Sequence, residues 1–307
     1  MVATILRNLR SGRSALMLAQ ARSFDHPLFW GRLCLAIGFG LVALAAKSDP
    51  FASLWAGSGS DKAQMRLIAG TPHDHGLYRA AAEIKLAGAA ITYWRAPGDA
   101  GVPPTFSFQG SENLASAAVA YPAPQRINEQ GLEAFGYRGD VTFPIAVTAR
   151  DPAKPVRLRL TLDYAVCDNI CLPAKSVATL QLPQKGTSAA EKLIAQAEAR
   201  VPLQLTKAAV EKEIVIAADP VAQQPRWILT WNGAALPVDL FAEAPDGWDI
   251  ETKKLADRRF SLIAAQQPLK GLPARVPAQL TLTTAQQSYV FAVDLDLPAQ
   301  ASSAGPR

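Results

Sequence analysis

Short runs of alternating apolar and polar residues are the feature that most constrains the fold of this chain. They occur between Met65 and Pro183 and again between Leu203 and Leu297. Alternation with a period of two indicates strands with one buried face, and the Pro and Gly residues between the runs indicate turns. The clearest runs are Ala82–Leu86, Thr105–Phe108, Val141–Val147, Val156–Leu162, Ser176–Leu182, Glu213–Ala217, Arg226–Trp231, Phe260–Ala264, Gln279–Thr283 and Ser288–Leu295. Short strands at this spacing predict a mainly β protein built from β-sandwiches.

One stretch between these two regions has a helical pattern instead. Lys192–Arg200 has helical spacing and ends before Pro202. Ser188 and Glu191 precede it at the spacing of a capping box, which predicts the start of a helix. If this helix is not docked on a sandwich, proteases are expected to cut near it.

These patterns predict five segments. They are a signal peptide at 1–46, a β-sandwich at 53–184, a helical linker at 185–202, a second β-sandwich at 203–298 and a disordered tail at 299–307. Each predicted sandwich is long enough to bury a core of its own.

The N-terminal segment resembles an export signal. Five arginines and a single acidic residue lie in residues 1–32, and the uncharged run Leu33–Ala46 follows. A helix of that run would be about 21 Å long, shorter than the hydrocarbon core of about 30 Å. Ala43-Leu44-Ala45 fits a signal-peptidase site. We therefore expect export from the cytoplasm to a compartment in which disulfides can form. An uncleaved membrane anchor is the alternative.

The rest of the chain carries almost no net charge. The sequence has 31 Lys and Arg against 26 Asp and Glu, but five of the basic residues and one acid lie in residues 1–46. A nucleic-acid partner requires a basic patch, and none is visible. No hydrolase or phosphate-loop motif is present either. A group of acids around turn residues is predicted to be a solvated loop, and its members are Glu243, Asp246, Asp249 and Glu251.

Cys167 and Cys171 are the predicted functional residues. The third cysteine, Cys34, lies in the predicted signal peptide. Four steps along a strand span about 13 Å, whereas bonded cysteines have Cα atoms about 4.4–6.8 Å apart, so a disulfide here requires a sharp turn. Closing so small a ring stabilises a fold by only about 2 kcal/mol. The pair therefore favours a chemical role over a purely structural one.

An ordered set of short motifs gives the chain a resemblance to a known family. The motifs are Thr92–Gly101, Gly110–Asn113, Tyr121–Pro124, Gly136-Tyr137, Phe143-Pro144, Leu162–Cys167 and Cys171–Pro173. Over residues 77–183 the sequence resembles the N-terminal periplasmic domain of DsbD, the protein-disulfide reductase, and most closely its ScsB-like relatives. The resemblance implies an immunoglobulin-like β-sandwich whose cysteine pair carries out thiol-disulfide exchange in the periplasm, without a cofactor.

The resemblance also implies partners and roles. Electrons would come from a membrane donor of the CcdA or DsbD type and pass to periplasmic thioredoxin-like or disulfide-isomerase-like proteins. Cys171 would engage the partner and Cys167 would resolve the mixed disulfide. The family connects the chain with cytochrome c biogenesis and copper tolerance. In the best-known DsbD type five residues separate the cysteines, whereas three do so here, and DsbD continues into membrane and thioredoxin-like domains that these residues do not contain.

Three further expectations concern the surroundings of the pair. Ile127–Phe135 is the positional candidate for a loop that shields the cysteines, with Phe135 either a lid or a core residue. Tyr164 is expected to pack inside the sandwich. Asp168 would raise the pKa of a neighbouring thiol if it lay close in space, because a negative charge disfavours the thiolate.

Two functions of other classes remain open. One is a copper-tolerance module, since two thiolates suit Cu(I). His73 and His75 form a His-x-His pair far from the cysteines in sequence, and we assign no residue as a metal ligand. The other is a binding protein in which the disulfide is purely structural.

Overall fold

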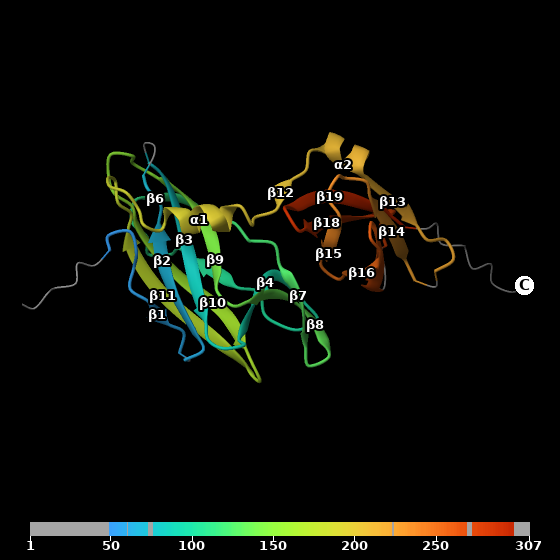
Figure 1. The fold of residues 1–307 in the computed structure, drawn as a ribbon, viewed down its shortest axis with the longest axis horizontal. Coiled ribbons are helices and arrows are strands. Elements are labelled where there is room, and N and C mark those ends of the chain that lie inside the picture. The colour runs from blue at the N-terminus through green and yellow to red at the C-terminus, as the bar shows by residue number, and fades with distance from the viewer. Residues whose placement is uncertain (1–48, 60, 73–75, 223, 269–271, 298–307) are drawn as a thin grey trace, which may run out of the picture. The chain divides into compact units, whose positions relative to one another are not determined.

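A computed structural model describes residues 49–59, 61–72, 76–222, 224–268 and 272–297 (Figure 1). The predicted signal peptide, the tail at 299–307 and the pair His73 and His75 lie outside the described residues. The described chain is mainly β, as predicted, with strands that form two sandwiches. Among these residues, neither helix has the length and apolar character needed to span a bilayer.

The first sandwich consists of two antiparallel sheets. In order, the first contains β1 (Ala56–Gly57), β2 (Ala63–Ala69), β3 (Leu77–Leu86), β9 (Val141–Ala149) and β6 (Leu114–Val119). The second contains β11 (Cys171–Gln181), β10 (Arg157–Cys167), β4 (Ile91–Gly98), β8 (Leu132–Arg138) and β7 (Gln125–Glu129), and β5 (Thr105–Ser107) also pairs with β10. Along β10, Leu158, Leu160 and Leu162 are fully buried, so alternation directs one face into the core.

The second sandwich is built in the same way. One sheet contains β12 (Leu203–Gln204), β19 (Ser288–Asp296), β18 (Arg275–Thr284) and β15 (Pro237–Glu243). The other contains β13 (Ile214–Ala218), β14 (Arg226–Trp231), β17 (Arg259–Gln266) and β16 (Asp249–Ala256). Trp227, Trp231 and Phe260 fill its core. Burying such large side chains removes much apolar surface from water, which is the main source of stability for a domain of this size.

All ten strands expected from alternation are present; β14 has the expected ends, and the other nine differ at one or both ends. β4 was not predicted, because Ile91, Thr92, Tyr93 and Trp94 are all buried and the run therefore shows no alternation. β7 and β8 were not predicted either, although both lie in or beside the expected shielding segment.

The predicted helix exists as α1 (Glu191–Glu198), but the predicted capping box is wrong. Ala190 is the N-cap and makes no side-chain capping bond. The Ser188 hydroxyl donates to the Ala69 carbonyl at 2.6 Å, and the Glu191 carboxylate accepts from the Thr71 N–H at 2.7 Å. Both side chains thus attach the helix to the first sandwich instead of capping it.

α1 is docked on the first sandwich. Ile194 is fully buried and packs with Ile68 and Ala81, and Arg79 forms ion pairs with Glu191 and Glu198. Protease cleavage near this helix was expected only if the helix was not docked on a sandwich, and that condition is not met. A second helix, α2 (Lys207–Glu213), was not predicted; Thr206 caps it by accepting from the Ala209 N–H.

Candidate functional site

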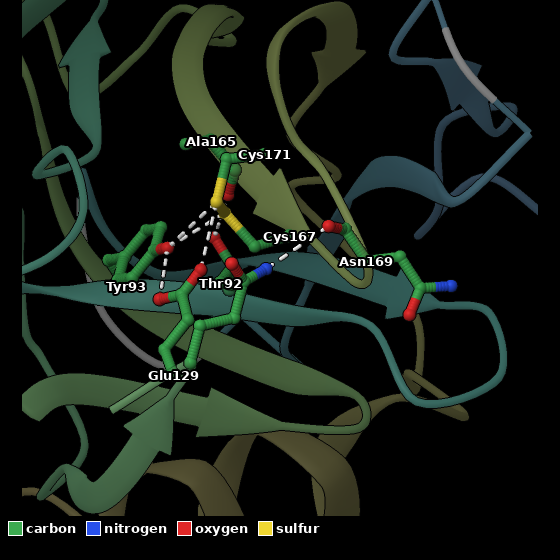
Figure 2. Close-up of a disulfide and its surroundings, with 8 residues drawn as sticks. Thr92, Tyr93, Glu129, Ala165, Cys167, Asn169 and Cys171 are labelled. Atoms are coloured by element: carbon green, nitrogen blue, oxygen red, sulfur yellow. Dashed lines mark hydrogen bonds between the residues drawn. A yellow bond between two sulfur atoms is a disulfide. The ribbon is translucent and has the colours of Figure 1, made fainter. Parts of the chain in front are cut away.

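Cys167 and Cys171 form a disulfide at the closed end of the β10–β11 hairpin (Figure 2). The two residues lie directly opposite each other in the strand register, with Cα atoms 4.0 Å apart. The sharp turn that the sequence required is the three-residue loop between them. Cys167 is only 1 % exposed, whereas Cys171 is exposed. The two members of this disulfide therefore differ in their exposure to solvent.

Two polar side chains contact the sulfur atoms. The Tyr93 hydroxyl lies 2.7 Å from Cys167 Sγ and 3.4 Å from Cys171 Sγ, and it donates to Glu129 Oε2 at 2.7 Å. Glu129 Oε1 lies 2.9 Å from Cys171 Sγ. Figure 2 shows both side chains converging on the disulfide, with Tyr93 from β4 and Glu129 from the end of β7.

The chemistry of these groups differs between the oxidised and the reduced pair. Disulfide sulfurs carry no proton, so the contact of Cys171 with Glu129 is a close S···O approach in the oxidised state. After reduction the carboxylate is in place to accept a hydrogen bond from the Cys171 thiol. Burial, followed by the hydrogen bond to Glu129, raises the pKa of Tyr93, so its hydroxyl stays protonated and can donate at neutral pH.

The expected shielding loop is a regular hairpin, and Glu129 is the residue in it that reaches the disulfide. Gln130 and Gly131 form its turn with positive φ angles, and Gln130 Nε2 donates to the Asn169 carbonyl in the cysteine loop at 3.2 Å. Phe135 is a core residue, 9 % exposed, and does not cover the cysteines as a lid. We refer to β7, β8 and their turn as the cap hairpin.

The other two expectations about neighbouring residues have different outcomes. Tyr164 packs in the core as expected, with its hydroxyl 3.3 Å from Ser176 Oγ. Asp168 forms an ion pair with Lys62 at 3.2 Å. The carboxylate that contacts a cysteine sulfur is that of Glu129. The acid at the cysteine pair is therefore far from it in sequence, and alternation could not have identified it.

The predicted solvated acidic loop is also wrong in part. Glu243 ends β15 and forms a bidentate ion pair with Arg95, at 2.8 Å for both bonds. Asp249 and Glu251 lie on β16. Both are exposed, and partial desolvation together with the charge of Asp99 raises the pKa of each.

Exposed apolar side chains lie next to the disulfide in the chain. Ile170, in the cysteine loop, is 73 % exposed, and Leu172, which follows Cys171, is also exposed. Leu132, opposite Glu129 in the cap hairpin, is a third exposed member. Exposed apolar groups clustered near a reactive site are typical of a protein-docking surface.

The fold and the disulfide together define the class: a β-sandwich domain with an accessible disulfide at a hairpin end. Residues 63–183 match the family described as "Thiol:disulfide interchange protein DsbD, N-terminal". This part of the chain is a DsbD N-terminal-like domain, as the sequence motifs predicted. The family match indicates thiol-disulfide exchange.

Two solved structures match the chain, to very different degrees. The crystal structure of the N-terminal periplasmic domain of ScsB from Proteus mirabilis matches with a TM-score of 0.64 at 20% identity, over 81% of this chain and 99% of that chain. It supports the immunoglobulin-like fold and extends beyond the family match. A chimeric titin Z1Z2 also matches, at 12% identity over 78% of this chain and 100% of that chain, but its TM-score of 0.16 is too low to indicate a shared fold. No curated protein matches the sequence.

Gly101 leaves room for the Tyr93 ring, and we expect Gly101→Ala to displace that ring. A Cβ at Gly101 would lie 2.3 Å from the ring, and the residue has a φ of +114°. The clash and the backbone strain should together lower the free energy of unfolding by about 2–4 kcal/mol, measured by chemical denaturation. Gly88→Ala is the control, because Gly88 has a φ of +63° but open space around it. Equal losses in both variants would contradict a specific fit to Tyr93.

Proposed function

We propose that this protein is a periplasmic thiol-disulfide exchange module that relays electrons through Cys167 and Cys171. The observation that carries the proposal is the asymmetry of the pair, with an exposed Cys171 bonded to a buried Cys167. A purely structural disulfide has no need for one accessible sulfur, or for a tyrosine and a carboxylate in contact with the two sulfurs.

The exchange runs in two steps. The Cys171 thiolate of the reduced protein attacks one sulfur of a partner disulfide, that disulfide breaks, and the partner's other sulfur leaves as a thiolate. The Cys167 thiolate then attacks Cys171 Sγ, which restores the Cys167–Cys171 bond and releases the partner's second thiolate. Two electrons pass to the partner, the pair is oxidised, and the partner's thiolates take up protons from water.

Glu129 and Tyr93 have distinct roles in this scheme. The Glu129 carboxylate accepts a hydrogen bond from the Cys171 S–H group and keeps Cys171 a thiol in the free protein, because an adjacent negative charge disfavours the thiolate. The single O–H of Tyr93, which is donated to Glu129 in the oxidised protein, turns to Cys167 Sγ when that residue leaves or attacks as a thiolate. Because the cap hairpin carries Glu129, its displacement by a docking partner would release the thiolate of Cys171.

The family and the exposed surface both support the choice of partners. Exposed Ile170, Leu172 and Leu132 offer an apolar contact suited to periplasmic thioredoxin-like or disulfide-isomerase-like proteins. A membrane protein of the CcdA or DsbD type would supply the electrons. The similarity to a periplasmic domain of ScsB and the charged, then apolar, N-terminal segment support export to the periplasm.

Trapping of a mixed disulfide tests this function. In a Cys167→Ser variant expressed in the periplasm, Cys171 should capture a partner in a covalent complex, visible on non-reducing gels and lost on reduction. The Cys171→Ser variant should capture much less, because Cys167 is buried. If neither variant captures a partner, the relay is contradicted.

Cu(I) binding is the second candidate function. The observation in its favour is that donor atoms of Glu129, Cys167 and Cys171 lie within 4.8 Å of one another, and soft thiolates suit Cu(I). In that case the reduced protein would hold Cu(I) against a chelator, both serine variants would lose it, and no partner would be trapped.

A further inference from the structure

The outward face of β15 contacts the two strands that supply Tyr93 and Glu129. Asp239, Phe241 and Glu243 alternate along β15, so they project from one face of the strand. Leu240, between them, is fully buried in the core of the second sandwich. We call Asp239, Phe241 and Glu243 the β15 ridge.

Asp239 binds the cap hairpin through Arg126. The Arg126 guanidinium donates to both carboxylate oxygens of Asp239, at 3.0 and 2.9 Å, and to the Leu240 carbonyl at 2.9 Å. The same guanidinium also bonds to Glu133, on the other strand of the hairpin. A planar bidentate pair of this kind fixes orientation as well as distance. Arg126 lies on β7, three residues before Glu129.

Phe241 contacts β8 and β4 through its ring, and Glu243 contacts β4 through an ion pair. Phe241 is 1 % exposed, and its ring packs edge-on against Phe135 of β8 at 5.0 Å and against Trp94 of β4 at 6.0 Å. Glu243 pairs with Arg95 of β4. Trp94 and Arg95 directly follow Tyr93, so every member of the ridge contacts an element that carries a group touching the disulfide.

We infer that the second sandwich positions the redox site: the β15 ridge braces β4 and the cap hairpin, and so holds Glu129 against Cys171. This inference rests on the proposed role of Glu129 at the cysteine pair. Arg126 and Asp239 are positioning residues in it, since neither touches a sulfur. When the ion pair between Asp239 and Arg126 is removed, the tip of the hairpin moves away from Cys171, whose thiolate becomes less disfavoured and more accessible.

The test measures the alkylation rate of Cys171 at pH 7 in the full-length Cys167→Ser protein, by mass spectrometry of the Cys171 peptide. Asp239→Ala should raise that rate roughly threefold, part of the tenfold change expected when one pKa unit of charge repulsion is removed. The matched control is Asp296→Ala, which breaks an exposed pair with Arg275 in the same sandwich and should leave the rate unchanged.

A double-mutant cycle separates positioning from general destabilisation. In a Glu129→Gln background, Asp239→Ala should raise the rate much less, because the charge that it positions is already removed and only the gain in access remains. The same increase in both backgrounds, or no increase in either, would overturn the inference. If Asp239→Ala does not fold, Asp239→Asn keeps the shape of the side chain and carries the same expectation. The readout needs no protein partner, so a failure of mixed-disulfide trapping would leave this test intact.

Discussion

The single thiol of a Cys171→Ser variant should be alkylated about a hundredfold more slowly than that of Cys167→Ser, because reaching Cys167 requires a local opening that costs roughly 3 kcal/mol. Cys167 is 1 % exposed and its sulfur contacts the Tyr93 hydroxyl. Cys171 follows the turn of the hairpin and is exposed. Rates of reaction with iodoacetamide at pH 7, followed on the cysteine-containing peptides, measure the difference.

Unfolding supplies the control for this comparison. In denaturant the two single-thiol variants should react at similar rates, because burial no longer distinguishes them. Comparable rates for the two native proteins would show that the buried sulfur is open to attack. That result would contradict the assignment of Cys171 as the sulfur that engages partners.

Glu129→Gln should raise the alkylation rate of Cys171 at pH 7 about tenfold, the change produced by one pKa unit in favour of the thiolate. The carboxylate lies 2.9 Å from Cys171 Sγ, and an amide of the same shape removes its negative charge. The pH profile of alkylation should move to lower pH, because less alkaline solution is then needed to form the thiolate. Measurements between pH 6 and 10 on the Cys167→Ser background would record this shift.

Asp168→Asn is the matched control for the loss of a carboxylate. Asp168 is next to Cys167 in sequence, but its charge is paired with Lys62, so this variant should have a smaller effect than Glu129→Gln. A larger increase in the alkylation rate from Asp168→Asn than from Glu129→Gln would instead support the expectation that Asp168 raises the pKa of the neighbouring thiol. An unchanged or slower rate in Glu129→Gln would contradict the role given to Glu129.

Alternation predicted those strands that bury one face. β10, with Leu158, Leu160 and Leu162 pointing inward, is the clearest example. β4 was missed because the central sheet strand buries residues on both faces. The motif Thr92–Gly101 was recognised as part of the family resemblance, yet the contact of Tyr93 with the sulfurs could not be read from it, since Tyr93 lies 74 positions before Cys167.

Long-range ion pairs were the main information that the sequence did not reveal. Glu243 was interpreted as a solvated acid because its partner, Arg95, is 148 positions away. Arg126 and Asp239 are 113 positions apart. Their side chains look like ordinary surface charges in the sequence, and only the fold brings them together. The cysteine pair could be identified in advance because both of its members lie in one short motif.

The reduction potential of the Cys167–Cys171 pair tests the central claim most directly. It can be measured by equilibrating the protein with glutathione or dithiothreitol buffers of known potential and quantifying the free thiols of the Cys171 peptide. A relay predicts a value between about −270 and −180 mV, in the range of known thiol-disulfide exchange proteins. A value below about −300 mV, typical of structural disulfides, would contradict electron transfer through this pair.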